Sequence, residues 1–325
     1  MALISFFSAK GAPGVTSTAM LVAALWPRPT LLVDADGAGG DLQMRLPNEA
    51  GTALTQHPGL LTLLPLARHG LAPGVVLDHS QVVTGGQRIL VGLESPEQSD
   101  AAGSLWPTLA RSFRELPGYD VIVDAGALSL RAGQLGLVQR GDLAVGVVRP
   151  NPASVMHMRQ RVAALHDTFR VLGPDAPRLG LVCIEDVQHQ GEASSAVATV
   201  RGDLPDVLDL GQVALDARAE RLFHGDPVAR PERTMLVRSG GSLVQRLVAA
   251  VGPVSQPDPE HAPEPGAEPQ PAPGTPFVTR RAARSAARAG GARETREGHE
   301  DGIPEDGGPG RSADSTPPRK RRWRR

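Results

Sequence analysis

A glycine-containing segment near the start of the sequence has residue types that bind phosphate. It runs from Ser8 to Ser17, reads SAKGAPGVTS, and lies between an apolar run at 2–7 and a helical pattern at 16–26. Glycines allow backbone N–H groups to converge on an anion, and a helix start adds the positive end of its dipole. A hydroxyl placed like that of Thr16 can ligate Mg²⁺. The segment alone also fits an ordinary strand-to-helix turn, because short glycine motifs are weak signals.

Acidic residues follow two further apolar runs. Asp34 ends the run 30–34, Asp36 follows two residues later, and Asp124 ends the run 120–124. Carboxylates at strand ends beside a phosphate-binding loop are where phosphoryl transfer needs a metal ion and an attacking water to be held. Each acid alone fits a solvated strand end, whereas all three in this order favour a nucleotide site.

Apolar runs alternate with helical patterns through most of the chain. The runs lie at 2–7, 30–34, 88–93, 121–125, 143–148 and 179–184, and the helical patterns lie at 16–26, 101–115 and 153–172. This alternation predicts an α/β fold, a mostly parallel sheet with helices on both faces. Ligands bind beyond the carboxyl ends of the strands in such sheets, which points to the loops 8–17, 34–41 and 124–131.

The composition changes sharply near Gly252. Residues beyond it are rich in Pro, Gly and Arg and could bury little core, so we predict a folded domain at 1–251 and a disordered tail at 252–325. Arginine clusters at 280–288 and 319–325, the second with Trp323, could bind DNA or an anionic membrane surface. They equally fit a solubilising tail, because the tail also carries acids.

The overall composition excludes several protein classes. The sequence is 40% hydrophobic but only 3% aromatic, and its net charge of -1 gives no general attraction to polyanions. The single cysteine, Cys183, excludes an intramolecular disulfide and fits a reducing compartment. No apolar run approaches the ~20 residues that span a bilayer, and the N-terminus lacks signal-peptide features. We therefore expect a cytoplasmic protein.

The three motifs together resemble those of the ParA/MinD group of P-loop NTPases. That group carries a deviant phosphate loop, KGGxGK[ST][ST], then a D-x-D element and an apolar strand ending in Asp. The resemblance covers roughly residues 1–250 and extends more loosely to the CpaE/TadZ-like branch, which is linked to pilus assembly. It implies a positioning or assembly factor that binds ATP or ADP with Mg²⁺, forms a homodimer and associates with a membrane, the nucleoid or pilus and secretion machinery.

The resemblance also implies roles for the matching residues. These are Lys10 as the signature lysine that reaches the phosphates of a dimer partner, Gly11 and Gly14 as loop glycines, Thr16 as the Mg²⁺ ligand with Ser17 beside it, Asp36 as the switch carboxylate associated with the attacking water, and Asp124 as the Walker B aspartate and second metal ligand.

Several positions depart from the family pattern. Val15, within the predicted binding loop, replaces the lysine that holds the β- and γ-phosphates, and losing such a charge-assisted contact typically costs ~1.5–3 kcal/mol. Pro13 has no N–H to donate, and Ala12 replaces a glycine. The segment 184–186 reads Ile-Glu-Asp where family members often place an asparagine that reads adenine.

These departures leave alternatives open. In one, Lys10 compensates for Val15 and slow ATP turnover survives; in the other, the fold is a nucleotide-independent scaffold of a pilus, secretion or partitioning system. We favour nucleotide binding with poor or absent hydrolysis. A third alternative is an NAD-binding oxidoreductase with Asp34 on the ribose, although Gly11-x-x-Gly14 lacks the third glycine of that fingerprint.

Overall fold

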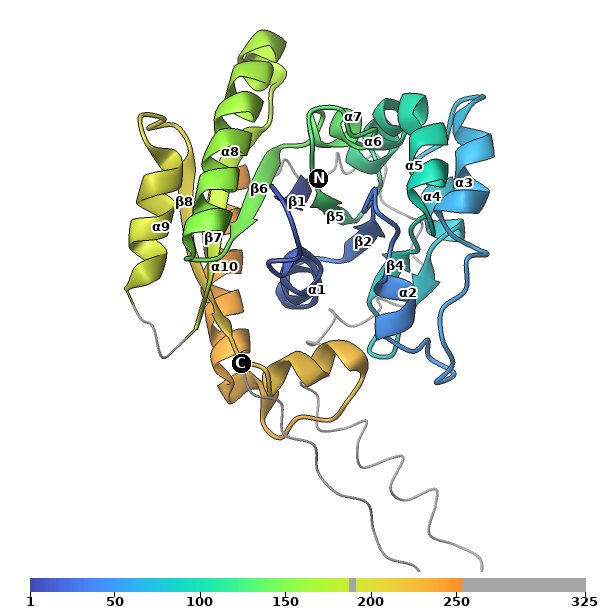
Figure 1. Ribbon diagram of the computed structural model, residues 1–325. Helices are drawn as coiled ribbons and strands as arrows, with labels where there is room; N and C mark the ends of the chain where they lie inside the picture. Colours follow the sequence, from blue (N-terminus) through green and yellow to red (C-terminus); the bar gives the residue numbers. More distant parts are fainter. Residues whose placement is uncertain (187–190, 253–325) are drawn as a thin grey trace, which may run out of the picture. The chain divides into compact units, whose positions relative to one another are not determined.

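The computed structural model describes residues 1–186 and 191–252, shown in Figure 1. In this part of the chain, the strands are β1 (Leu3–Ser8), β2 (Thr30–Asp34), β3 (Gln81–Val82), β4 (Arg88–Leu90), β5 (Asp120–Ala127), β6 (Leu143–Val148), β7 (Arg178–Asp186) and β8 (Leu208–Leu215). They form one eight-stranded sheet in the order β3-β4-β2-β5-β1-β6-β7-β8. All neighbouring strands are parallel except β3 and β4. The predicted α/β fold is therefore confirmed.

Helices cover both faces of the sheet (Figure 1). The helices described are α1 (Val15–Leu25), α2 (Leu42–Arg45), α3 (Leu60–Ala67), α4 (Val75–Asp78), α5 (Pro96–Ala101), α6 (Trp106–Arg114), α7 (Leu135–Val138), α8 (Pro152–Leu172), α9 (Glu192–Arg201) and α10 (Met235–Val251), with 3₁₀ turns η1 (Gly103–Leu105), η2 (Gly173–Asp175), η4 (Ala219–His224) and η5 (Pro231–Arg233). One apolar cluster joins the sheet to α1, α10 and η4, and the other joins it to α3, α4 and α6 to α9. None of these helices is long and apolar enough to cross a bilayer.

The central strands are buried on both sides, which explains their continuous apolar sequences. Every residue of β1 and β6 is buried. Because successive side chains point to opposite faces, Ile4 and Phe6 pack in the cluster with α1, whereas Leu3 and Phe7 pack in the other. Cys183 is buried in β7, and burial raises the pKa of its thiol to about 12, as expected for an unreactive core cysteine.

Several elements differ from their predicted bounds. The helix expected at 101–115 is divided into α5, η1 and α6, and a proline at the start of α6 fits a new helix beginning there. Strand β4 ends at Leu90, and β5 continues past Asp124 to Ala127 because its pairing with β1 continues. The predicted tail lies, from residue 253 on, outside the described residues, and it stays a prediction.

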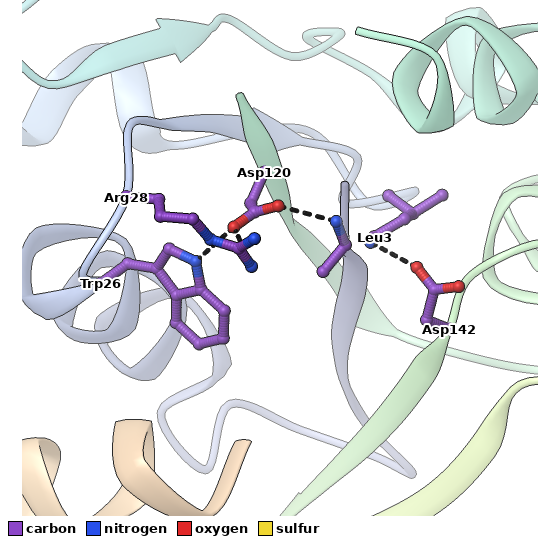
Figure 2. A network of polar contacts seen from close by, with 6 residues as sticks. Leu3, Trp26, Arg28, Asp120 and Asp142 are labelled. Carbon is purple, nitrogen blue, oxygen red and sulfur yellow. Dashed lines mark hydrogen bonds and ion pairs between the residues drawn. The ribbon is translucent and has the colours of Figure 1, made fainter. Parts of the chain in front are cut away.

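Two acids, the buried Asp120 and the partly exposed Asp142, anchor the amino-terminal ends of the central strands (Figure 2). The carboxylate of Asp120, at the start of β5, accepts hydrogen bonds from the Ala2 backbone N–H and the Trp26 indole N–H, both at 2.7 Å. It also pairs with Arg28 at 2.6 Å. Asp142, just before β6, accepts the Leu3 N–H at 2.8 Å. These bonds tie β1 to both neighbouring strands and to the end of α1.

Replacing Asp120 should destabilise the domain. Asp120→Ala leaves two buried N–H donors without their acceptor and removes the partner of Arg28, so we expect the free energy of unfolding to fall by about 2–5 kcal/mol. Urea denaturation followed by circular dichroism measures this change. Trp26→Phe removes only the indole donor and should cost less; a loss below about 1 kcal/mol for Asp120→Ala would contradict this account.

Candidate functional site

The glycine-containing loop has a fixed backbone between β1 and α1. Gly11 and Gly14 adopt φ values of +70° and +120°, which side-chain-bearing residues rarely adopt. The Ser8 hydroxyl donates to the Gly11 carbonyl at 3.0 Å, and the Thr18 hydroxyl donates to the Gly14 carbonyl at 2.7 Å. Gly14 is the N-cap of α1, so the unpaired N–H groups of the first helical turn follow directly. Such a loop can present N–H donors to an anion.

A cavity of about 550 Å³ lies beside this loop. Its lining comes from segments far apart in the sequence: Ser8, Gly11, Ala12 and 14–17 from the loop, Asp36 and Ala38 after β2, Arg45 in α2, Gly126 and Ala127 in β5, Arg149 after β6, and Glu220, Phe223 and His224 in η4. The three loops predicted from the carboxyl ends of the strands thus meet at one cavity. The volume suits a small-molecule ligand.

Thr16 and Asp124 lie in direct contact beside the cavity. The Thr16 hydroxyl donates a hydrogen bond to the Asp124 carboxylate, which also accepts the Gly126 N–H at 3.0 Å. Asp124 is only 1% exposed, and burial raises its pKa to about 6 despite these hydrogen bonds. A hydroxyl and a carboxylate oxygen are hard donors of the kind that Mg²⁺ prefers.

The Asp36 carboxylate lies close to the same end of β5. A Cβ atom on Gly126 would overlap the Asp36 carboxylate, so glycine permits this approach. Asp36 accepts the Ala38 N–H at 2.9 Å, and partial burial raises the pKa of its carboxyl. In the described residues, no three His, Cys, Asp or Glu side chains form a metal cage. Mg²⁺ needs none, since one or two carboxylates usually bind it together with phosphate and water.

Asp34 has a different place from Asp36. Its carboxylate is buried and accepts the N–H groups of Leu42 at 3.1 Å and Asp36 at 3.4 Å. Gly40 and Gly92 pack against it so closely that neither could carry a Cβ. Burial, followed by repulsion from Asp124, raises the pKa of Asp34 well above its usual value. Asp34 thus shapes the loop that carries Asp36, and the ribose-binding role of the oxidoreductase alternative finds no support.

The loop residues that depart from the family pattern make structural contacts. Val15 is 5% exposed and packs in the apolar cluster between α1 and the sheet, although it also borders the cavity. Ser17 borders the cavity and is half-buried. The Pro13 carbonyl accepts a hydrogen bond from the Arg149 side chain at 3.1 Å. No charge enters the cavity from Val15.

Lys10 lies outside the cavity. It is exposed and borders a separate open hollow of about 460 Å³ with Pro13, Asn151 and His157. The structure therefore brings Gly11, Gly14 and Val15 to the cavity, together with Thr16, Ser17 and Asp36, and sets Asp124 behind Thr16. It does not bring Lys10 into its own chain's cavity.

The segment that replaces the adenine-reading asparagine has structural contacts. The Glu185 carboxylate accepts the N–H groups of Gly191 at 3.0 Å and Ala193 at 2.9 Å, at the start of α9. Ile184 is buried and borders a hollow of only about 20 Å³. Neither contact provides an obvious base-recognition group.

Four charged or titratable cavity residues were missed in the sequence. Arg45 forms a two-point contact with Asp41 at 3.1 and 2.7 Å, and Glu220 and His224 come from η4. Arg149 follows β6 directly, so it obeys the same strand-end rule that identified Asp36 and Asp124. Applying that rule to the run 143–148 would have included Arg149.

The raised pKa of Asp124 predicts a pH-dependent effect of replacing it. The folded chain holds this proton more tightly than the unfolded chain does, so this group's stabilisation is present below pH 4 and lost as pH rises through about 6. Asp124→Asn removes the buried charge and should raise stability at pH 8 by up to about 3 kcal/mol relative to the parent. Its advantage should shrink towards pH 4.

Urea denaturation at pH 4 and pH 8 measures the difference, with Asp203→Asn, at an exposed position, as the control. An Asp124→Asn difference that is the same at both pH values would contradict the assigned burial effect.

The fold is shared with solved ATPases. No protein-family model and no curated protein matches the sequence. A ParA family ATPase from Chlorobium tepidum TLS has 18% identity and a TM-score of 0.58, over 76% of this chain and 98% of that one. The Cyanothece McdA(D38A)-ATP complex has 15% identity and a TM-score of 0.58, over 76% and 96%. The septum site-determining protein MinD from Pyrococcus horikoshii OT3, complexed with Mg-ADP, has 21% identity and a TM-score of 0.54, over 76% and 95%. This chain therefore has the fold of the ParA/MinD P-loop NTPases.

Proposed function

We propose that this protein is a ParA/MinD-like positioning or assembly factor that binds ATP or ADP with Mg²⁺ and hydrolyses ATP poorly or not at all. The observation that carries the proposal is the meeting of Thr16, Asp124 and Asp36 beside a cavity bordered by the glycine-containing loop. The McdA and MinD structures with the same fold contain ATP and Mg-ADP, respectively. Their ligands have the phosphate chemistry that this site suits.

Each site residue has a specific role in this proposal. Backbone N–H groups from Gly11 to Ser17, other than that of Pro13, receive the phosphates at the start of α1. Thr16 and Asp124 hold Mg²⁺, which when bound neutralises charge on the phosphate oxygens. Asp36 is placed beside Asp124 to orient a water molecule. The Asp124 carboxyl must lose its proton to serve as a ligand, and its pKa of about 6 leaves it ionised above neutral pH.

The loop substitutions favour binding over turnover. Val15 supplies neither charge nor a side-chain donor, and positioning and electrostatic stabilisation carry most of phosphoryl-transfer catalysis. Pro13 removes one backbone donor. A site without these groups can keep ground-state contacts while losing those that stabilise the transition state.

The position of Lys10 supports a homodimer in which Lys10 of each chain contacts the phosphates bound to the other chain. Lys10 is exposed and lies outside its own cavity, so its charge is available to a second molecule. We propose face-to-face association governed by nucleotide, in a cytoplasmic protein that attaches peripherally to a membrane or the nucleoid. The arginine clusters proposed for that attachment, to anionic lipid or DNA, lie outside the described residues. Pilus or secretion machinery remains the proposed partner class.

A second candidate is a nucleotide-independent scaffold of the same machinery. Two observations favour it: Val15 is packed in the core, and the hollow beside Ile184 has almost no free volume. In this alternative, the fold supports protein contacts and the cavity has no ligand.

Nucleotide should stabilise the protein if the first proposal holds. At a ligand concentration of ten times Kd, binding adds about 1.4 kcal/mol, which raises Tm by roughly 3–6 °C for a domain of this size. Thermal melts with millimolar Mg-ATP or Mg-ADP measure the shift, with Asp124→Ala as the variant that should lose the Mg²⁺-dependent part. No shift in the parent at saturating nucleotide would favour the scaffold.

Lys10 should affect association and not folding. We expect ATP to increase dimerisation of the parent, measured by analytical ultracentrifugation, and Lys10→Ala to remove most of that increase because it removes the proposed cross-dimer charge. Arg170→Ala, an exposed change near the end of α8, is the matched control. Equal association of parent and Lys10→Ala, with and without ATP, would contradict the nucleotide-governed dimer.

A further inference from the structure

Arg149 contacts the glycine-containing loop, although it is far from that loop in the sequence. It is the first residue after β6, and its backbone N–H donates to the Ser154 hydroxyl at 3.1 Å, which anchors it to the start of α8. Its side-chain Nε donates to the Pro13 carbonyl at 3.1 Å. The residue borders both the 550 Å³ cavity and the hollow that contains Lys10. Its guanidinium is thus held at the edge of the loop.

The two Nη atoms of Arg149 are open to a ligand. Among residues 1–186 and 191–252, no carboxylate forms an ion pair with Arg149, and its side-chain hydrogen bond to the Pro13 carbonyl uses Nε alone. Arg45, the other arginine of the cavity, is held by both oxygens of Asp41. A guanidinium anchored through Nε can still offer both Nη groups to a phosphate as a planar pair of donors.

The charges around the cavity favour such a cation. Asp36 and Glu220 border it, and Asp124 lies behind Thr16, whereas Val15 contributes no charge. A nucleoside diphosphate or triphosphate brings several further negative charges to the same place. Arg45 is already paired with Asp41, so without Arg149 the bound Mg²⁺ would have to offset most of both sets of charges.

We propose that Arg149 is the phosphate-binding cation of this site, supplied by the strand next to β1 in place of the loop lysine that Val15 replaces. This inference rests on the proposed function, and its ligands are nucleoside diphosphates and triphosphates. The guanidinium contacts the polyphosphate group and not the base, so inorganic tripolyphosphate shares the same contact. Arg149 is a binding residue in this assignment, and its Nε contact with Pro13 fixes its direction.

Calorimetric titration of the full chain with Mg-ADP and with Mg-tripolyphosphate tests the assignment. We expect Arg149→Ala to weaken both ligands by about tenfold to a hundredfold, the range for loss of a charged hydrogen-bonded contact. Arg170→Ala, the exposed α8 change, should leave both affinities unchanged. Parent binding with equally tight binding by Arg149→Ala would overturn the inference and leave the proposed function standing. Absence of any binding by the parent would instead overturn the proposed function, and the inference with it.

Two further variants separate a phosphate contact from a structural contact with the loop. Arg149→Gln keeps an N–H donor for the Pro13 carbonyl but removes the charge, so it should bind as weakly as Arg149→Ala. Adding Val15→Lys to Arg149→Ala returns a cation to the loop and should restore affinity to within about threefold of the parent, if melting confirms that the double variant is folded. Parent-like binding by Arg149→Gln, or a folded double variant without recovery, would show that Arg149 only supports the loop and would overturn the assignment.

Discussion

Two adjacent buried carboxylates, Asp34 at the end of β2 and Asp124 in the carboxyl-terminal half of β5, constrain the structure of this edge of the sheet. Parallel pairing places Asp34 directly opposite Asp124, and both are 1% exposed. Burial raises the pKa of each carboxyl; repulsion from Asp124 adds to the rise for Asp34, and repulsion from Asp36 and Asp41 adds to it for Asp124. Their surroundings are correspondingly specialised: close-packed glycines around Asp34, and hydrogen bonds from Thr16 and Gly126 to Asp124. A cation placed here would offset the electrostatic cost of holding these two buried carboxylates side by side.

The acidic residues at the two ends of the sheet have different partners. At the amino-terminal end, Asp120 receives two N–H donors and a guanidinium, and Asp142 receives an N–H and pairs with Arg114 at 3.0 Å. At the carboxyl-terminal end, no positively charged side chain in the described residues forms an ion pair with Asp34, Asp36 or Asp124. The acids at the first end are therefore paired with cations, whereas these three acids at the second end are not. Rigid anchoring at the first end allows the second to keep this arrangement without unfolding.

The sequence predicted the parts of this design that depend on local pattern. The bounds of β2 and β6 match their apolar runs, because a strand buried on both faces needs an unbroken apolar sequence. The meeting of the loop with Asp36 and Thr16 follows from the strand-end rule. The division of α5 from α6 was missed although a glycine at the start of η1 and a proline at the start of α6 mark it in the sequence. Arg149 and Arg45 were missed for another reason. The sequence alone does not distinguish an arginine that points into solvent from one that lines a cavity. The position of Lys10 outside its own cavity also depends on three-dimensional placement alone.

If Arg149 replaces a loop lysine as the phosphate-binding cation, as we propose, phosphoryl transfer is affected as well as binding. A lysine in the loop would lie on a flexible stem and could follow a phosphoryl group as charge develops on it. The Arg149 guanidinium is instead held through Nε by the Pro13 carbonyl, and the Arg149 backbone N–H donates to the Ser154 hydroxyl, so the position of this cation is restricted. Rate acceleration requires contacts that strengthen between the bound state and the transition state. A fixed cation supplies that gain only if it lies where charge develops in the transition state, and the position of Arg149 is set by its contact with the loop backbone. Whether Arg149 serves the proposed nucleotide binding alone or also turnover therefore depends on where the phosphoryl group lies relative to its guanidinium.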